Sequence, residues 1–282
     1  MPAVLHCGGR VLDLSQPLVM GVLNVTPDSF SDGGCFLHPD DALRRVEIML
    51  GEGAAIIDLG AESTRPGARA VSEQEELDRL LPVLEAVAAR FDVVLSIDTS
   101  CPAVMTEAAA RGAGLINDVR SLTRPGALAA AGATGLPVCI MHMQGQPRTM
   151  QEAPVYTDVV DEVRGWLEDR VDACVAAGIK RDRLLLDPGF GFGKTLAHNL
   201  ELLARLREIR VGDLPLLVGM SRKSMLGAVL GGAPVNQRLF AGVAAAALAV
   251  ERGAAIIRTH DVRATYEAMA VAAALLPWEK RA

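Results

Sequence analysis

A regular succession of short apolar runs constrains the fold of this chain more than any other feature of its sequence. Eight runs rich in β-branched or other apolar residues recur along the chain, with helical patterns between them. Their ends are about 34 residues apart, the length of one strand plus one helix. Eight consecutive units of this kind predict an α/β protein built as a closed, parallel (β/α)8 barrel, the TIM barrel. The runs are 18–25, 55–61, 93–99, 115–119, 136–143, 184–189, 215–221 and 255–261.

One alternative architecture, an open doubly wound sheet, needs a glycine-rich dinucleotide-binding turn directly after its first strand. The loop after the first run instead reads Asn24-Val25-Thr26-Pro27-Asp28-Ser29-Phe30-Ser31-Asp32-Gly33-Gly34. The sequence has no linker and no low-complexity tract. We therefore expect residues 1–282 to form one barrel domain, a size that α/β barrels commonly reach as a single domain.

Helical patterns fill the segments between the apolar runs. Ser72 and Glu75 form a capping-box pattern, in which the hydroxyl and the carboxylate bond to opposite amide donors. Apolar residues then follow at helical spacing as far as Phe91. Further helices are predicted over 155–177, 199–209, 237–252 and 264–275.

Charge and cysteine content exclude several classes of protein. The formal net charge is -6, whereas a chain that binds the nucleic-acid backbone is normally basic, so no nucleic-acid partner is expected. The five cysteines include no CxxC pair, which argues against a disulfide framework or a structural zinc site. No signal peptide or membrane-spanning run is apparent, and we expect a cytoplasmic protein without a membrane partner.

Polar residues fall at the carboxyl ends of almost all the predicted strands, where barrel enzymes build their active sites. Several of these residues are two positions apart, a spacing that would place both side chains on one face of a strand. The set comprises Asn24, Asp58, Glu62, Thr64, Ser96, Asp98, Asn117, Asp118, Asp187, Ser221, Lys223, Arg258 and His260.

For any one of these residues, Asp58 for example, a purely structural role is as plausible as a functional one. The whole set would be costly to bury without a ligand, because barrel interiors are mostly apolar. The residues also divide by charge, into a group of acceptors and a group of cations. Asp98, Asn117 and Asp187 can accept hydrogen bonds from an N–H-rich ring such as an amino-pyrimidinone, whereas Lys223, Arg258 and His260 suit a phosphate. Arg65 is a further candidate for binding an anion.

Two glycine-rich motifs fail on inspection. Residues 189–195 resemble a phosphate-binding P-loop, but Pro188 stands where that pattern requires glycine. A dinucleotide fingerprint fails as well, because Leu196 occupies its last glycine position. A glycine-rich turn beside an aromatic pocket wall, with Phe192 in that wall, is the better interpretation. His142 lies in an apolar run and is interpreted as a structural core histidine.

Longer motifs resemble those of the dihydropteroate synthase family, in the order in which that family has them. The first is the Asn24–Gly34 loop, and the second is Asp58-Leu59-Gly60-Ala61-Glu62-Ser63-Thr64-Arg65-Pro66-Gly67. Later blocks are Met141-His142-Met143-Gln144-Gly145, Asp187-Pro188-Gly189-Phe190-Gly191-Phe192-Gly193-Lys194, Ser221-Arg222-Lys223 and Arg258-Thr259-His260-Asp261. The resemblance extends from about residue 10 to about residue 275.

The resemblance implies a transferase of folate biosynthesis. Such an enzyme joins p-aminobenzoate to 6-hydroxymethyl-7,8-dihydropterin diphosphate, releases pyrophosphate and is a sulfonamide target. By similarity, the pterin site would contain Thr64, Asp98, Asn117, Asp187 and Lys223, and the diphosphate would bind to Arg258 and His260. Asn24 would bind Mg²⁺, and the p-aminobenzoate site would be formed by Phe30, Asp32, Arg65, Pro66 and Ser221. The family also implies a homodimer.

These roles suggest a mechanism in which the bond to diphosphate breaks first. Mg²⁺, Arg258 and His260 would stabilise the leaving group, and Asp98 would stabilise the resulting pterin cation. Loop 1 (26–36) and loop 2 (63–71), with Asp32 and Arg65, would act as lids that exclude water.

Three other functions stay open on the sequence alone. A pterin-binding methyltransferase module would share the barrel but act with a corrinoid partner. A non-catalytic relative would be expected to lose loop residues such as Asp32 or Arg65, and both are present. The third is a generic barrel whose polar residues are structural.

Overall fold

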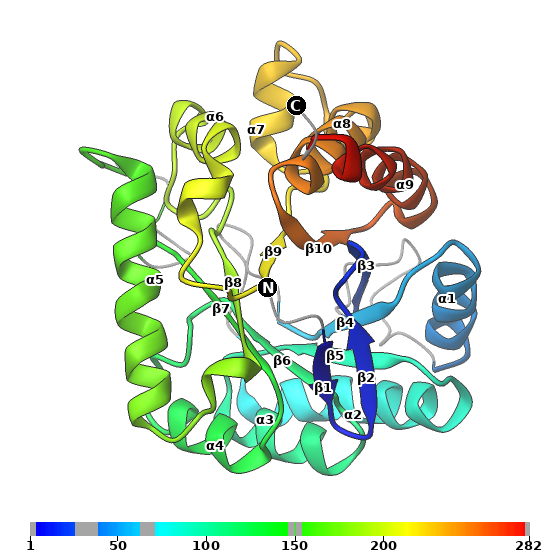
Figure 1. Ribbon diagram of the computed structural model, residues 1–282. Coiled ribbons are helices and arrows are strands. Elements are labelled where there is room, and N and C mark those ends of the chain that lie inside the picture. The colour runs from blue at the N-terminus through cyan, green and yellow to red at the C-terminus, as the bar shows by residue number, and fades with distance from the viewer. Residues whose placement is uncertain (1–3, 26–38, 63–70, 146–149, 151–153, 280–282) are drawn as a thin grey trace.

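The computed structural model describes residues 4–25, 39–62, 71–145, 150 and 154–279. Eight parallel strands close into a barrel, with neighbours in the order β10-β3-β4-β5-β6-β7-β8-β9 (Figure 1). The predicted barrel is therefore confirmed, and the open sheet is excluded. The strands are β3 (Leu18–Asn24), β4 (Ile56–Gly60), β5 (Val94–Asp98), β6 (Leu115–Asp118), β7 (Val138–Met141), β8 (Leu184–Asp187), β9 (Leu216–Val218) and β10 (Ala254–Thr259).

Helices follow the strands and form a ring around them (Figure 1). They are α1 (Pro39–Gly51), α2 (Glu73–Arg90), α3 (Pro102–Ala110), α4 (Ala127–Thr134), α5 (Val159–Ala176), α6 (Leu196–Ala204), α7 (Ser224–Val229), α8 (Leu239–Glu251) and α9 (Val262–Glu279). The 3-10 turns are η2 (Arg181–Arg183), η3 (Leu206–Ile209) and η4 (Val235–Gln237). Within the described residues, no helix combines the length and apolar character needed to cross a bilayer.

Helix ends follow local hydrogen bonds and differ in places from the sequence-based prediction. Ser72 caps α2 as predicted, since its hydroxyl accepts the Glu75 amide at 3.2 Å. The helix predicted from residue 155 begins only at Val159, because the Gln144 amide holds both main-chain groups of Val155 and the Asp158 side chain caps the first turn. The helix predicted over 199–209 is wrong as a single element. It ends at Ala204, and the 3-10 turn η3 follows.

A hairpin that the sequence analysis missed closes the amino-terminal end of the barrel. β1 (Val4–Cys7) pairs antiparallel with β2 (Arg10–Asp13), in dark blue in Figure 1. Leu5 and Leu12 point inward from this hairpin and pack with the first apolar side chains of the barrel interior, including Met20. The hairpin therefore excludes water from that end, which leaves the carboxyl-terminal end as the accessible one.

The barrel interior changes from apolar to polar along the strands. Ile56, Leu115 and Leu185 face inward in the lower layer, next to the hairpin. The inward positions two residues further along the same strands are Asp58, Asn117 and Asp187, and all three are buried. The alternate residues point outward and form the apolar interface with the helices. The strand pattern thus concentrates charge near the carboxyl-terminal mouth.

Candidate active site

Arg258 joins two carboxylates at the mouth of the barrel. Its Nε donates to Asp58 Oδ2 at 2.6 Å, and one terminal nitrogen donates to Asp98 Oδ2 at 2.8 Å. Burial alone would lower the pKa of the Arg258 guanidinium, but the Asp58 and Asp98 carboxylates raise it overall. Arg258 is therefore charged at every pH at which the protein is folded, and it balances much of the acidic charge of this region.

Asp98 has a carboxyl whose pKa lies near neutrality. Burial raises its pKa to about 7, although the neighbouring Arg258 lowers it. Asp98 ends β5, and strand register places it beside Gly60 of β4, which in turn lies beside Asn24 of β3. Catalytic groups commonly have pKa values shifted toward neutrality. Asp98, at the end of its strand, therefore fits a catalytic role.

Asp187 and Lys223 lie next to a glycine-rich turn. Asp187 accepts the Gly189 amide at 2.7 Å, and its pKa is raised by burial. Burial lowers the pKa of Lys223 to about 8, against the raising effect of Asp187. The Lys223 ammonium donates to the main-chain oxygen of Phe190 and lies 4.7 Å from the centre of the Phe192 ring. Phe192 thus lies beside Lys223, and its place in a pocket wall stays a prediction.

Ser221 and Lys223 do not share a strand face, so that prediction is wrong. β9 ends at Val218, and Ser221, Arg222 and Lys223 form a turn in which Arg222 has φ of 61°. The turn sends the two side chains to different partners. Ser221 Oγ lies 3.1 Å from Nδ1 of His260, which follows β10, whereas Lys223 contacts the Phe190 carbonyl group.

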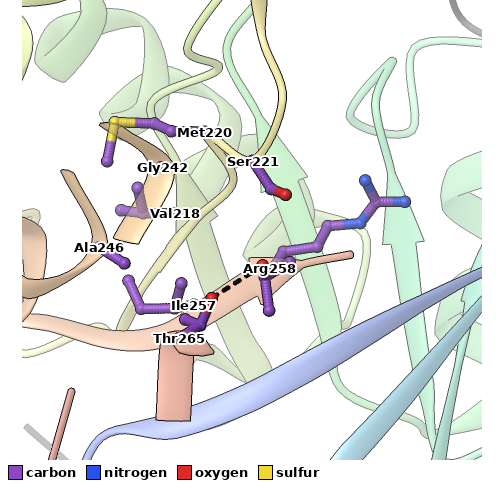
Figure 2. A pocket seen from close by; sticks show the side chains of 9 residues that line it. Val218, Met220, Ser221, Gly242, Ala246, Ile257, Arg258 and Thr265 are labelled. Atoms are coloured by element: carbon purple, nitrogen blue, oxygen red, sulfur yellow. Dashed lines mark hydrogen bonds between the residues drawn. The ribbon is translucent and has the colours of Figure 1, made fainter. Parts of the chain in front are cut away.

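A small pocket of about 10 Å³ lies behind this part of the rim, between β9, β10 and the helices α8 and α9 (Figure 2). Its walls include Val218, Ala246 and Thr265. Figure 2 shows the Arg258 guanidinium turned away from it. A cavity of this size has room for about one water molecule, so the mouth of the barrel is the better candidate for a substrate site.

Five predicted site residues lie outside the described part of the chain: Phe30, Asp32, Thr64, Arg65 and Pro66. Among the strand-end residues, Glu62 forms an ion pair with Arg120 at 3.1 Å. Asn24 ends β3 at the same rim and is half-buried. The described residues contain no cluster of three acidic, histidine or cysteine side chains that could hold a metal ion. A single protein ligand such as Asn24 fits a magnesium site in which phosphate oxygens and water supply most of the ligands.

Sequence reasoning missed the role of Lys194. Its buried ammonium donates to the main-chain oxygens of Gly189 and Phe192, both at 3.0 Å, and lies 2.9 Å from Nδ1 of His142. Gly189 has φ of 69°, and a Cβ there would collide with the His142 carbonyl oxygen. Because these partners are mainly backbone atoms, a sequence motif gives little sign of them. His142 is buried, as a core histidine would be, and its structural role stays a prediction.

Comparison with known proteins agrees with this geometry. A family model described as pterin binding enzyme matches residues 20–260. Dihydropteroate synthase of Escherichia coli strain K12 is 57% identical over 272 residues, which cover 96% of each chain. A crystal structure of the Yersinia pestis dihydropteroate synthase in a sulfonamide drug complex has a TM-score of 0.93 and 59% identity, covering 97% of this chain and 99% of that one. The Burkholderia cenocepacia enzyme complexed with 7,8-dihydropteroate has a TM-score of 0.89 and 49% identity, covering 100% and 99%.

The barrel, the polar mouth and these matches define the class: the chain belongs to the pterin-binding enzymes. Within that family it is one of the dihydropteroate synthases, which are transferases of folate biosynthesis.

Proposed function

We propose that the enzyme joins p-aminobenzoate to 6-hydroxymethyl-7,8-dihydropterin diphosphate. In this reaction the bond between the pterin methylene carbon and the diphosphate oxygen breaks, and a bond to the arylamine nitrogen forms. The products are 7,8-dihydropteroate, pyrophosphate and a proton. The observation that carries the proposal is the presence, at one barrel mouth, of buried acceptors beside half-buried cations, in a chain so similar to known dihydropteroate synthases.

The pterin ring would bind among Asp98, Asn117, Asp187 and Lys223. The first three are acceptors that match the N–H groups of an amino-pyrimidinone, and Lys223 can donate to its carbonyl oxygen. Burial of Asn117 and Asp187 supports this role, because buried acceptors need donors. Thr64 is proposed to lie near the same ring, and the complex with 7,8-dihydropteroate of the Burkholderia cenocepacia relative is consistent with a pterin pocket.

The diphosphate would bind to Arg258 and His260. Arg258 has a planar guanidinium suited to phosphate oxygens, and its Nη1 is engaged by neither carboxylate. Arg258 would also stack on the pterin ring. His260 follows β10 and is held by Ser221. Asn24 is proposed to bind Mg²⁺, which when bound would neutralise the charge that develops on the leaving group.

Bond cleavage would leave a cation on the methylene carbon, shared with the pterin ring. Asp98 in its ionised form could stabilise that cation, because it lies at the ring side of the mouth. The arylamine is a neutral nucleophile, so positioning it matters more than deprotonating it.

The p-aminobenzoate site would be formed by Phe30, Asp32, Arg65, Pro66 and Ser221. The first four belong to loops 1 and 2, and all four lie outside the described residues. These loops would order on binding and exclude water from the cation. A sulfonamide would compete for this site, since the similar Yersinia pestis enzyme has been solved with such a drug.

The decisive experiment follows pyrophosphate release with both substrates and Mg²⁺ present. We expect release that depends on p-aminobenzoate, and formation of 7,8-dihydropteroate by mass spectrometry. Chelation of the metal should slow the reaction, and added Mg²⁺ should restore it. If pyrophosphate release did not depend on p-aminobenzoate, the proposed reaction would be refuted. If chelation left the release unchanged, only the magnesium site would be refuted.

A homodimer is proposed from the surface of α8 and α9. Phe240 is 83% exposed, and Leu248 lies two turns further along the same helix. Val271 and Leu275 form a similar exposed stripe on α9, which packs against α8. Apolar stripes on two adjacent helices suit a two-fold interface with a second copy of the chain.

The enzyme is proposed to work in the cytoplasm. Cys7, Cys101, Cys139 and Cys174 are free and buried, which suits a reducing compartment. Fractionation of cells that produce the protein would test this, and recovery in an oxidising compartment would contradict it.

A further inference from the structure

Asp58 is a fully buried carboxylate at the centre of the hydrogen-bond network below the mouth. It accepts from the Ser96 hydroxyl at 2.6 Å and from Arg258 Nε at 2.6 Å. The side-chain nitrogen of Asn117 lies 3.3 Å from one of its oxygens and 3.4 Å from the other. Two of its three partners, Arg258 and Asn117, are proposed to bind the substrate.

Asp58 lies deeper in the barrel than Asp98. In the strand register it pairs with Ser96, whereas Gly60, two residues further along β4, pairs with Asp98. Its side chain is 0% exposed, while that of Asp98 is 12% exposed. A ligand at the mouth would therefore meet Asp98 first and would reach Asp58 only through the groups above it.

The contact with Arg258 fixes the plane of the guanidinium. Asp58 holds Nε from inside the barrel, and Asp98 holds one terminal nitrogen from the rim. A substrate anion could replace Asp98 as the partner of the terminal nitrogen. The bond between Asp58 and Arg258 Nε would then stay intact. The terminal nitrogens of Arg258 could then donate to the anion in the same plane, while Nε keeps its bond to the buried Asp58.

The contact with Asn117 fixes the direction of its amide. The amide nitrogen of Asn117 faces Asp58 and donates to its carboxyl oxygens. The amide oxygen is then directed away from Asp58 and is available as an acceptor. An acceptor is what an N–H group of a pterin ring requires.

We propose that Asp58 is a positioning residue, which holds Arg258 in the plane that binds diphosphate and holds Asn117 with its oxygen toward the pterin. This inference rests on the proposed function. It assigns a role to a carboxylate that is not itself expected to contact substrate.

Asp58→Asn tests the inference, because it keeps the shape and replaces one acceptor oxygen with a donor. The KM for pterin diphosphate should rise about tenfold or more, the effect of one lost charged hydrogen bond. The KM for p-aminobenzoate should change less than about threefold, because a change of that size corresponds to the loss of at most one weak contact. A purely structural role would lower the melting temperature and leave both KM values of the folded fraction unchanged.

Asp118→Asn is the matched control. The Asp118 side chain is as buried as that of Asp58 and accepts from Ser100 and from the Leu122 amide, whereas the side chains of Arg258 and Asn117 donate to Asp58. We expect a similar loss of melting temperature and little change in the KM for pterin diphosphate. Equal KM values in the two variants would overturn the inference, while the wild-type assay would still establish the reaction.

Two further measurements keep the inference falsifiable if Asp58→Asn does not fold. In the wild-type enzyme, the Arg258 Nε–H NMR signal, assigned with Arg258→Lys, should exchange slowly with water and remain slow after pterin diphosphate is added. Rapid exchange in the bound state would mean that Asp58 releases Arg258, which contradicts the inference. Ser96→Ala, which removes one donor to Asp58, should raise the KM for pterin diphosphate in the same direction but less; a fall would also contradict it.

Discussion

Nζ of Lys194 lies 2.9 Å from Nδ1 of His142 at a place where both side chains are at most 5% exposed. Burial, together with the nearby Lys194, lowers the pKa of His142 to about 2, so the imidazole is neutral. Burial also lowers the pKa of Lys194 to about 7. The lysine therefore donates to the imidazole, and it ties the Gly189–Gly193 turn to the end of β7.

Lys194→Met should destabilise the enzyme by about 2 kcal/mol at pH 10, because the Gly189 and Phe192 carbonyl groups lose their donor. The pKa of Lys194 is lower in the folded state than its ordinary 10.5. Its contribution to stability is thus fully present above pH 10.5 and is lost as the pH falls toward about 7. Denaturant melts should show the deficit of the variant shrinking over that range. Lys180→Met, at an exposed site, is the control, and a deficit that grows on acidification would contradict this account.

Asp98→Asn should lower kcat more than it weakens pterin diphosphate binding, because the ionised carboxylate acts on the developing cation. In the wild-type enzyme kcat should rise with pH through an apparent pKa of about 7. That limb should disappear in the variant. A variant that retains the wild-type limb would assign the titration to another group.

Asp98 should also influence stability in the opposite sense. Its pKa is raised in the folded state from 3.8 to about 7. The stability that it contributes is fully present below pH 3.8 and is lost as the pH rises to about 7. Relative to the wild type, Asp98→Asn should therefore gain in free energy of unfolding as the pH rises from about 4 to about 7. Denaturant melts at several pH values test this, and a relative loss over that range would show that the sign is wrong.

Arg258→Ala should weaken pterin diphosphate binding by at least about 1.5–3 kcal/mol, the contribution of a charged hydrogen bond. Isothermal calorimetry with pterin diphosphate and Mg²⁺ measures this directly. Arg263→Ala removes an exposed arginine from the first turn of α9 and should leave the affinity unchanged. An unchanged affinity in Arg258→Ala would remove this residue from the diphosphate site.

Leu5→Ala should destabilise the enzyme by about 2–5 kcal/mol, because the side chain fills the amino-terminal end of the barrel and is 1% exposed. Val11→Ala, in the same hairpin but 58% exposed, should change stability by at most about 0.5 kcal/mol. Both variants should keep the wild-type kcat/KM at 25 °C, since the hairpin lies at the far end from the mouth. A large loss of kcat/KM in folded Leu5→Ala would contradict that separation.

Phe240→Asp should shift the enzyme from dimer to monomer in sedimentation experiments, because it places a charge in the proposed apolar interface. Ile48→Asp makes the same change at an exposed position of α1 and should leave the assembly unchanged. A wild-type enzyme that is monomeric at tens of micromolar would refute the dimer.

Much of the fold could be predicted because eight apolar runs recur about 34 residues apart, the length of one strand plus one helix. Apolar runs that end in a polar residue, such as the run ending at Asp98, showed both the strand and its accessible end. The hairpin β1–β2 could not be recognised in this way, since two four-residue strands give too short a pattern. The turn at Arg222 was also missed, because positive φ at a residue other than glycine depends on its surroundings.

The sequence could predict those parts of the candidate site that consist of charged side chains at strand ends, such as Arg258 and Asp187. Strand spacing did not reveal that Arg258 bonds to Asp58 as well as to Asp98, because that choice depends on side-chain conformation. It also did not reveal Lys194, whose partners are mainly main-chain oxygens. Phe30, Asp32, Thr64, Arg65 and Pro66 remain predictions from the family resemblance.

The turn from Gly189 to Gly193 restricts what natural selection can alter in this enzyme. A Cβ at either glycine would meet a main-chain oxygen, of His142 or of Gln144, which cannot swing aside as a side chain can. Amino-acid substitutions at these two glycines should therefore abolish folding of the enzyme instead of giving folded variants with an altered pocket. A lineage under pressure from a competitive inhibitor would have to find its escape mutations elsewhere, where side chains and not the backbone line the site.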